Sequence, residues 1–121
     1  MSAYTFRHSF RVEPYAFHVY VFTDKEKWMR FVARRRKVTL RDVRADTGAA
    51  VGACSYDGAA SMCYVGVFNG NAGTLAHEMT HAAMSVLSHT GVRVTPSNNE
   101  ALCYLVGYMV EQCAALIGSP G

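Results

Sequence analysis

The segment TLAHEMTHAA, residues 74–83, contains the spacing His-Glu-x-x-His. If this segment is helical, His77 and His81 lie one turn apart, so both imidazoles project from the same face and can share one metal ion. Glu78 is turned by about 100° from His77, which lets it reach a water on that metal. Zn²⁺ suits these groups because it binds neutral imidazole nitrogen and carboxylate oxygen in tetrahedral geometry. The segment therefore predicts a helix with a zinc site on one face.

A helical wheel of this segment separates two faces. His77 and His81 lie with Ser88 on the side opposite the apolar residues. We therefore expect the histidines to face a cleft, while the other side of the helix packs into the core. The apolar residues of that side are Leu75, Met79, Ala82, Ala83, Val86 and Leu87.

The size and composition of the chain predict one compact domain over residues 1–121. Half of its 121 residues are hydrophobic, which supports a folded core and argues against disorder. The sequence has no N-terminal pattern of a signal peptide. The most apolar late stretch, Ala101–Gly118, is interrupted by Glu111 and Gln112 and is too short for a membrane span. We expect a soluble, cytoplasmic protein.

Basic residues concentrate in the stretch Arg30–Arg44, which holds seven of the twelve in the chain. One interpretation is a patch that binds an acidic partner or nucleic acid. The other is a solvated helix end whose cations suit the C-terminal helix dipole. The second interpretation is favoured, and both remain open from the sequence.

The four cysteines lack a CxxC pair, which argues against a structural zinc knuckle. Cys103 and Cys113 lie ten residues apart on one expected helix, too far to bond to each other. Cys54 is expected opposite Cys63 across a hairpin. Free buried thiols are the default in a cytosolic protein, although a bond between these two stays open.

The remaining sequence predicts strands, then a helix, a hairpin and two helices. His8 and His18 lie on two of the strands without a motif and are expected to be structural. Asp24 is a good N-cap for the first helix, whose Trp28 is expected to pack on the sheet. Val38–Arg44 is left as an edge strand or a connection, and Asp46-Thr47-Gly48 is predicted to turn. The predicted elements are strands 4–13 and 16–23, helix 25–37, hairpin strands 49–56 and 61–68 around a loop at 57–60, and helices to about 89 and from 97 to 117.

A third metal ligand is needed, and Glu100 is the best candidate. Eighteen residues separate it from His81, enough for the helix, a loop and a returning antiparallel helix. His89 lies about 12 Å along the same helix from His81, too far to share the ion. A capping box starting at Ser97 explains Glu100 almost as well without any metal.

The segment TLAHEMTHAA resembles the zincin metallopeptidases, and the later Asn-Glu-Ala containing Glu100 is similar to the gluzincin branch. The resemblance spans about residues 15–117 and is similar in length to the minimal gluzincins. It implies an α+β fold like the zincin N-terminal subdomain, a mixed β-sheet packed on an active-site helix and a following glutamate helix. It also implies one Zn²⁺ per chain, held by His77, His81 and Glu100.

By this resemblance the chain is expected to be a small zinc metallopeptidase in which Glu78 activates a zinc-bound water and passes its proton to the leaving amine. The substrate is expected to bind as an added strand on Ser61–Phe68 or its hairpin partner. Tyr104 stands where relatives often have an aspartate that orients a histidine. Tyr104, Tyr108 and His89 are candidates for stabilising the oxyanion.

Two other hypotheses remain. The chain is either a non-catalytic binding or inhibitory protein that keeps the scaffold and uses Arg30–Arg44 on its partner, or a structural zinc domain. A structural site would have four protein ligands and no water.

Overall fold

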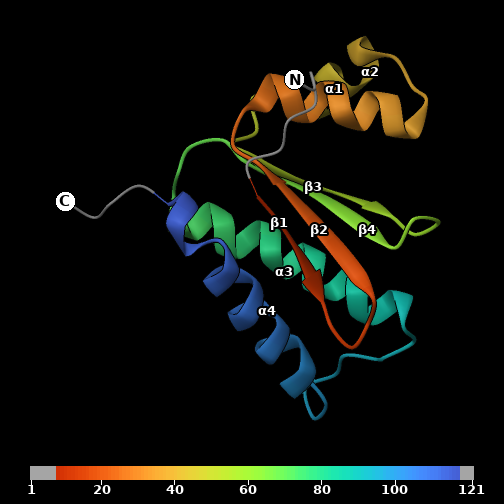
Figure 1. The fold of residues 1–121 in the computed structure, drawn as a ribbon, viewed down its shortest axis with the longest axis vertical. Coiled ribbons are helices and arrows are strands. Elements are labelled where there is room, and N and C mark those ends of the chain that lie inside the picture. The colour runs from red at the N-terminus through yellow and green to blue at the C-terminus, as the bar shows by residue number, and fades with distance from the viewer. Residues whose placement is uncertain (1–7, 118–121) are drawn as a thin grey trace.

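The computed structural model describes residues 8–117, which form an α+β fold (Figure 1). A four-stranded mixed sheet lies between two pairs of helices in this part of the chain. The elements are β1 His8–Val12, β2 Phe17–Phe22, α1 Lys25–Arg36, α2 Leu40–Thr47, β3 Gly52–Asp57, β4 Met62–Val67, α3 Ala72–His89, α4 Glu100–Gln112 and a short 3₁₀ turn at Ala114–Leu116.

The strand order β1-β2-β4-β3 places β1 and β3 at the two edges of the sheet among the described strands. β1 pairs antiparallel with β2, β2 pairs parallel with β4, and β3 pairs antiparallel with β4. The parallel pair requires a long crossover, which α1 and α2 provide on one face of the sheet.

Each face of the sheet has its own hydrophobic core, because side chains alternate along the strands. One core joins the sheet to α3 and α4, and the other joins it to α1 and α2 (Figure 1). The first contains Phe10, Val12, Phe17, Val19, Val21, Cys63, Val65 and Val67 beneath the apolar face of α3. The second contains Phe22, Trp28, Met29, Val32, Ala33, Val43 and Tyr64.

The predicted first helix is confirmed. The Asp24 carboxylate accepts a hydrogen bond of 2.9 Å from the backbone N–H of Lys27, and Lys37 ends α1 in the left-handed conformation. Trp28 is buried and donates its indole N–H to the Tyr64 carbonyl at 2.9 Å, so it is a core residue as expected.

Residues 40–47 differ from the prediction, which left Val38–Arg44 as a strand or connection. They form α2, because the Thr39 hydroxyl caps the helix by accepting from the N–H of Asp42 at 3.1 Å. Only Val43 of this helix is buried. A single apolar contact gives no periodic pattern, which explains why the sequence did not reveal the helix.

The hairpin is confirmed, but its register is shifted from the prediction. Cys54 pairs with Val65, while Cys63 pairs with Tyr56, so the two cysteines are diagonal neighbours on one face and not directly opposite. The loop runs one residue later than expected, because Ser61 adopts a φ of 53° and its N–H donates to the Gly58 carbonyl at 3.2 Å. Both cysteines are free thiols.

The last helix begins at Glu100 and not at Ser97, because Thr95 and Asn98 exchange backbone hydrogen bonds of 3.2 and 3.0 Å and hold the intervening residues in a turn. The predicted first strand is present as β1, and its residues 4–7 lie outside the described residues. No helix in residues 8–117 is long and apolar enough to cross a membrane.

Candidate metal centre

The helix α3 forms where the sequence predicted it. The Asn71 side chain caps its start by accepting from the N–H groups of Gly73 and Thr74, at 2.8 and 3.3 Å. Gly91 lies just beyond its end with a φ of 80°, a conformation that favours glycine. The apolar face is buried against the sheet and the opposite face is open, which confirms the two faces of the helical wheel.

His77, Glu78 and His81 form a cluster in which the donor atoms all lie within 4.8 Å of one another. The two imidazole rings are 5.0 Å apart at 76°, and His77 Nε2 lies 3.9 Å from Glu78 Oε2. Both histidines are exposed. No hydrogen bond joins either imidazole ring to another residue of the described chain, so their nitrogen lone pairs are available to a ligand.

Glu78 differs from the histidines because it is buried, with 7% of its surface exposed. It lies between α3 and the first residue of β3: a Cβ atom on Gly52 would come within 2.9 Å of Glu78 Oε2. Burial raises the pKa of the Glu78 carboxyl, and the nearby His77 and His81 partly offset this. The absence of a side chain at Gly52 is what makes room for the carboxylate.

A hollow of about 450 Å³ runs beside this cluster, between α3 and the edge strand β3. Tyr56 lies along the same hollow, and its hydroxyl shares a hydrogen bond of 2.6 Å with His89 Nδ1. His89 also contacts Ser61 Oγ through Nε2 at 3.2 Å. The lining residues are Gly52, Ala53, Cys54, Tyr56, Glu78, His81, Met84, Ser85 and Ser88.

Glu100 is not brought into the cluster. It is the first residue of α4, it is exposed, and it is not among the donors within 4.8 Å. The competing capping box is also not formed, because Ser97 lies in the preceding turn and the N-cap Asn99 makes no side-chain capping bond. Glu100 therefore stays a predicted third ligand.

The two tyrosine candidates lie away from the hollow. Tyr104 is 75% exposed on α4. Tyr108 donates its hydroxyl to the Arg11 carbonyl at 3.0 Å and packs edge-on against Phe10, which ties α4 to β1 at the opposite edge of the sheet from β3. Neither lines the hollow beside Glu78 and His81. His89 does contact a lining residue, Tyr56.

The donor set of the cluster fits a metal ion. Two imidazoles without hydrogen-bond partners and one carboxylate converge from a single helix, and nitrogen with oxygen donors is a combination that Zn²⁺ accepts. The side of the cluster away from the core is open, so a further protein ligand or substrate has access.

Comparisons of the chain with protein families, curated proteins and solved structures give no significant match. The assignment of a function therefore depends on the residues themselves.

The basic stretch makes many contacts within the chain. Arg30 and Arg44 both pair with Glu26, and Arg35 donates to the Tyr64 hydroxyl at 3.0 Å. Arg36 donates to Ser55 Oγ at 2.8 Å. These contacts favour an internal structural role for these four arginines.

Several residues of the hollow were not identified from the sequence. Ser85 follows His81 by one turn, and this spacing was a usable signal for a shared face. Met84 follows His81 by three residues, which is also a spacing for a shared helix face. Gly52 and Tyr56 had no such signal, because they come from β3 and only the packing of β3 against α3 brings them to the cluster.

Proposed function

We propose that the chain is a zinc-dependent peptidase that hydrolyses peptide bonds in extended segments bound along β3. The observation that supports this most directly is the cluster of His77, Glu78 and His81, of which Glu78 and His81 line a hollow whose other wall is an edge strand. The histidine metal ligands, the proposed base Glu78 and the free edge of β3 are then all within reach of one bound peptide.

The free edge of β3 can be assigned residue by residue. The N–H of Phe68 donates to the Val51 carbonyl at 2.9 Å, so Val51, Ala53 and Ser55 direct their backbone groups toward β4. The backbone groups of Gly52 and Cys54 therefore point away from β4, toward the free edge. An extended peptide can form backbone hydrogen bonds with these two residues by strand addition.

The edge ends at Tyr56. Its carbonyl accepts a hydrogen bond of 2.9 Å from Arg36 Nη2, which removes that acceptor from the free edge. A bound peptide is thus directed to the Gly52 end of β3, where Glu78 lies.

Zn²⁺, when bound, polarises a peptide carbonyl and makes a water more acidic. The chain's own residues perform the other tasks. His77 and His81 would hold the ion, with Glu100 proposed as the third ligand. The carboxylate of Glu78 accepts a proton from the attacking water and donates it to the leaving amine. Its contact with Gly52 keeps this carboxylate next to the strand that orients the peptide.

The metal is tested first, by measuring zinc content. The purified protein is expected to hold about one zinc per chain, and His77→Ala or His81→Ala is expected to abolish it. His18→Ala is the matched control, because His18 stacks on Tyr20 and lies outside the cluster. Glu100→Ala tests the third ligand and is expected to lower zinc affinity by at least about 10–100-fold, the loss typical of residues that only support metal ligands. Full zinc in both histidine variants would overturn the site.

Catalysis is tested separately with Glu78→Gln. This variant is expected to retain zinc and lose cleavage of a quenched fluorescent peptide library by at least about 100-fold. Glu111→Gln, which removes an exposed carboxylate at the end of α4, is the control. If zinc is retained and Glu78→Gln cleaves at the wild-type rate, the base is wrongly assigned. Zinc binding without any cleavage would favour a non-catalytic binding protein.

A further inference from the structure

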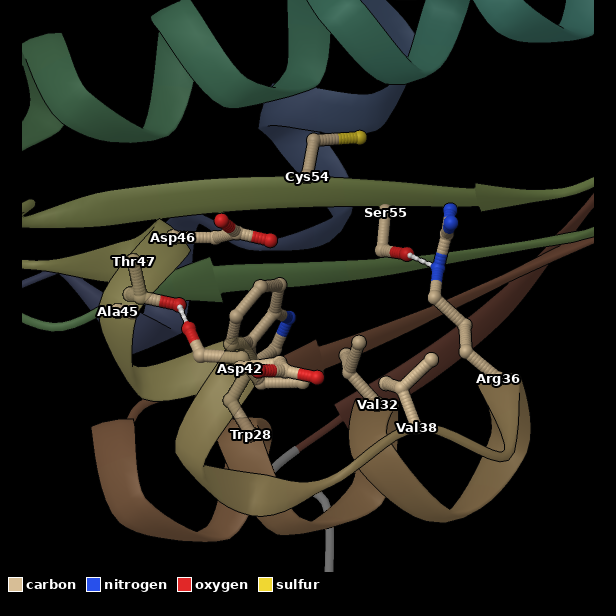
Figure 2. A pocket seen from close by; sticks show the side chains of 11 residues that line it. Trp28, Val32, Arg36, Val38, Asp42, Ala45, Asp46, Thr47, Cys54 and Ser55 are labelled. Atoms are coloured by element: carbon tan, nitrogen blue, oxygen red, sulfur yellow. Dashed lines mark hydrogen bonds between the residues drawn. The ribbon is translucent and has the colours of Figure 1, made fainter.

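A second hollow lies on the other side of β3. It encloses about 580 Å³ between α1, α2 and β3 (Figure 2). Its walls are apolar: Trp28, Val32 and Val43 are buried there, and Val38 is 46% exposed. The proposed reaction makes no use of this hollow.

The two hollows meet at the edge of β3, because Cys54 lines both of them. Figure 2 shows Cys54 pointing toward α3 and the next residue, Ser55, pointing the opposite way, toward Arg36. Successive side chains of this strand therefore point toward one hollow and then the other.

A peptide added to the free edge must follow the same alternation. Successive residues of an extended chain point to opposite faces of the sheet, about 3.3 Å apart along the strand. If one side chain faces α3 and His81, its neighbours face α1 and α2. A peptide paired with Gly52 and Cys54 thus places every second side chain on the face of the sheet that carries the hollow of Figure 2, with the residue between these two pairs nearest to it.

The charge of this hollow is unevenly distributed. Asp42 and Asp46 lie one turn apart on α2 at its rim, and neither carboxylate forms an ion pair with another described residue. Arg36 is the cation of the lining, and its guanidinium is already bonded to Ser55 Oγ and the Tyr56 carbonyl. The partners of Arg36 are neutral, so its charge remains; an incoming side chain meets apolar walls and two unpaired carboxylates against this one cation, which leaves negative charge in excess at the lining.

We propose that this hollow is a subsite for lysine or arginine side chains of the peptide bound along β3. The methylene groups of such a side chain contact Trp28, Val32 and Val38, while its cationic end lies beside Asp42 and Asp46. The substrates are then extended segments with basic residues at alternate positions. The inference rests on the proposed function for the placement of the peptide on β3.

Peptide binding without catalysis tests this subsite apart from the peptidase activity. The protein is metal-free Glu78→Gln, and the readout is the fluorescence of Trp28, the single tryptophan of the chain, which lines the hollow. The probe is a blocked peptide of about seven residues, slightly longer than the six of β3, that alternates threonine and lysine. A second peptide has glutamine in place of lysine, and a third has the same composition with its lysines consecutive.

The alternating lysine peptide is expected to bind about tenfold more tightly than the glutamine peptide and several-fold more tightly than the consecutive one. Asp42→Asn with Asp46→Asn is expected to weaken it about five- to tenfold, whereas Glu111→Gln leaves it unchanged. Val38→Lys places a cation of the chain itself at the half-exposed wall and is expected to weaken binding in the same way.

Equal affinity for the lysine and glutamine peptides, no effect of the two asparagine substitutions, or no binding of any peptide would each overturn the subsite. Tight, lysine-dependent binding by a protein that neither holds zinc nor cleaves peptides would retain the subsite and reject the proposed function. Cleavage of peptides without any preference for lysine would retain the proposed function and reject the subsite.

Discussion

Gly52→Ala is the most informative single substitution, because it tests the contact between β3 and the proposed base. A Cβ atom at this position would lie 2.6 Å from Thr74 Cγ2, 2.9 Å from Glu78 Oε2 and 3.0 Å from Glu78 Cγ. Ordinary contacts between non-bonded carbon atoms lie at about 3.5–4.0 Å. The methyl group therefore cannot be accommodated without displacement of one of these neighbours.

The loss of stability depends on which of these neighbours moves. Thr74 is β-branched and in the first turn of α3, so its methyl group cannot rotate away freely. Glu78 can turn outward, but its carboxylate then loses its place beside the strand. Overpacking of this kind costs about 1–3 kcal/mol in the free energy of unfolding. We expect about 2 kcal/mol, equivalent to a melting temperature lower by about 6–10 °C.

The assay is urea unfolding followed by Trp28 fluorescence, with zinc content and peptide cleavage measured on the same protein. Gly107→Ala is the matched control, since a Cβ there meets nothing within 4 Å, and it is expected to be neutral or to stabilise by up to about 1 kcal/mol. In a Glu78→Ala background the cost of Gly52→Ala is expected to fall, because two of the three close contacts are gone. A Gly52→Ala protein within about 0.5 kcal/mol of wild type and fully active would refute the placement of Glu78 against β3.

Four further outcomes are expected. Tyr64→Phe removes a hydroxyl that donates to Asp57 Oδ2 at 2.6 Å and accepts from Arg35 at 3.0 Å, so urea unfolding should show a loss of about 1–3 kcal/mol. Burial and the Asp57 hydrogen bond raise the pKa of Tyr64 from 10.0 to about 12. The neutral hydroxyl therefore contributes its full stabilisation below pH 10, and this stabilisation is lost as the pH rises through 12. An alkaline unfolding titration that is identical in Tyr64→Phe would contradict this. Arg36→Ala should speed hydrogen exchange of the β3 amides and lower the free energy of unfolding by about 1 kcal/mol, because two hydrogen bonds to β3 are lost. Substitution of the exposed Arg41 by alanine should do neither. Unchanged exchange in both variants would show that Arg36 does not stabilise the strand. Zinc at about 100 times its dissociation constant should stabilise the wild type by about 2.7 kcal/mol, an effect that a chelator reverses and that His77→Ala lacks; equal stabilisation of the variant would place the ion elsewhere.

Local patterns predicted much of the fold. Asp24 and Asn71 act as caps where the sequence placed helix starts, and strand β2 lies where aromatic and β-branched residues are consecutive. Helix α2 was missed because its single buried residue, Val43, leaves no periodic signal. The hairpin loop was placed one residue too early, which shifts the pairing by two residues, because the positive φ of Ser61 cannot be inferred from a serine in a polar loop.

The sequence alone determined the cluster of His77, Glu78 and His81, because residues on one helix are positioned by helix geometry and need no other part of the chain. The tertiary structure decided which parts of β3 lie beside the cluster and where the second hollow forms. Gly52 beside Glu78, the free edge of β3 and the hollow rimmed by Asp42 and Asp46 depend on packing between segments far apart in the chain. Glu100 belongs to this second kind, since its distance from the histidines depends on how α4 packs against α3, and no spacing in the sequence fixes that distance.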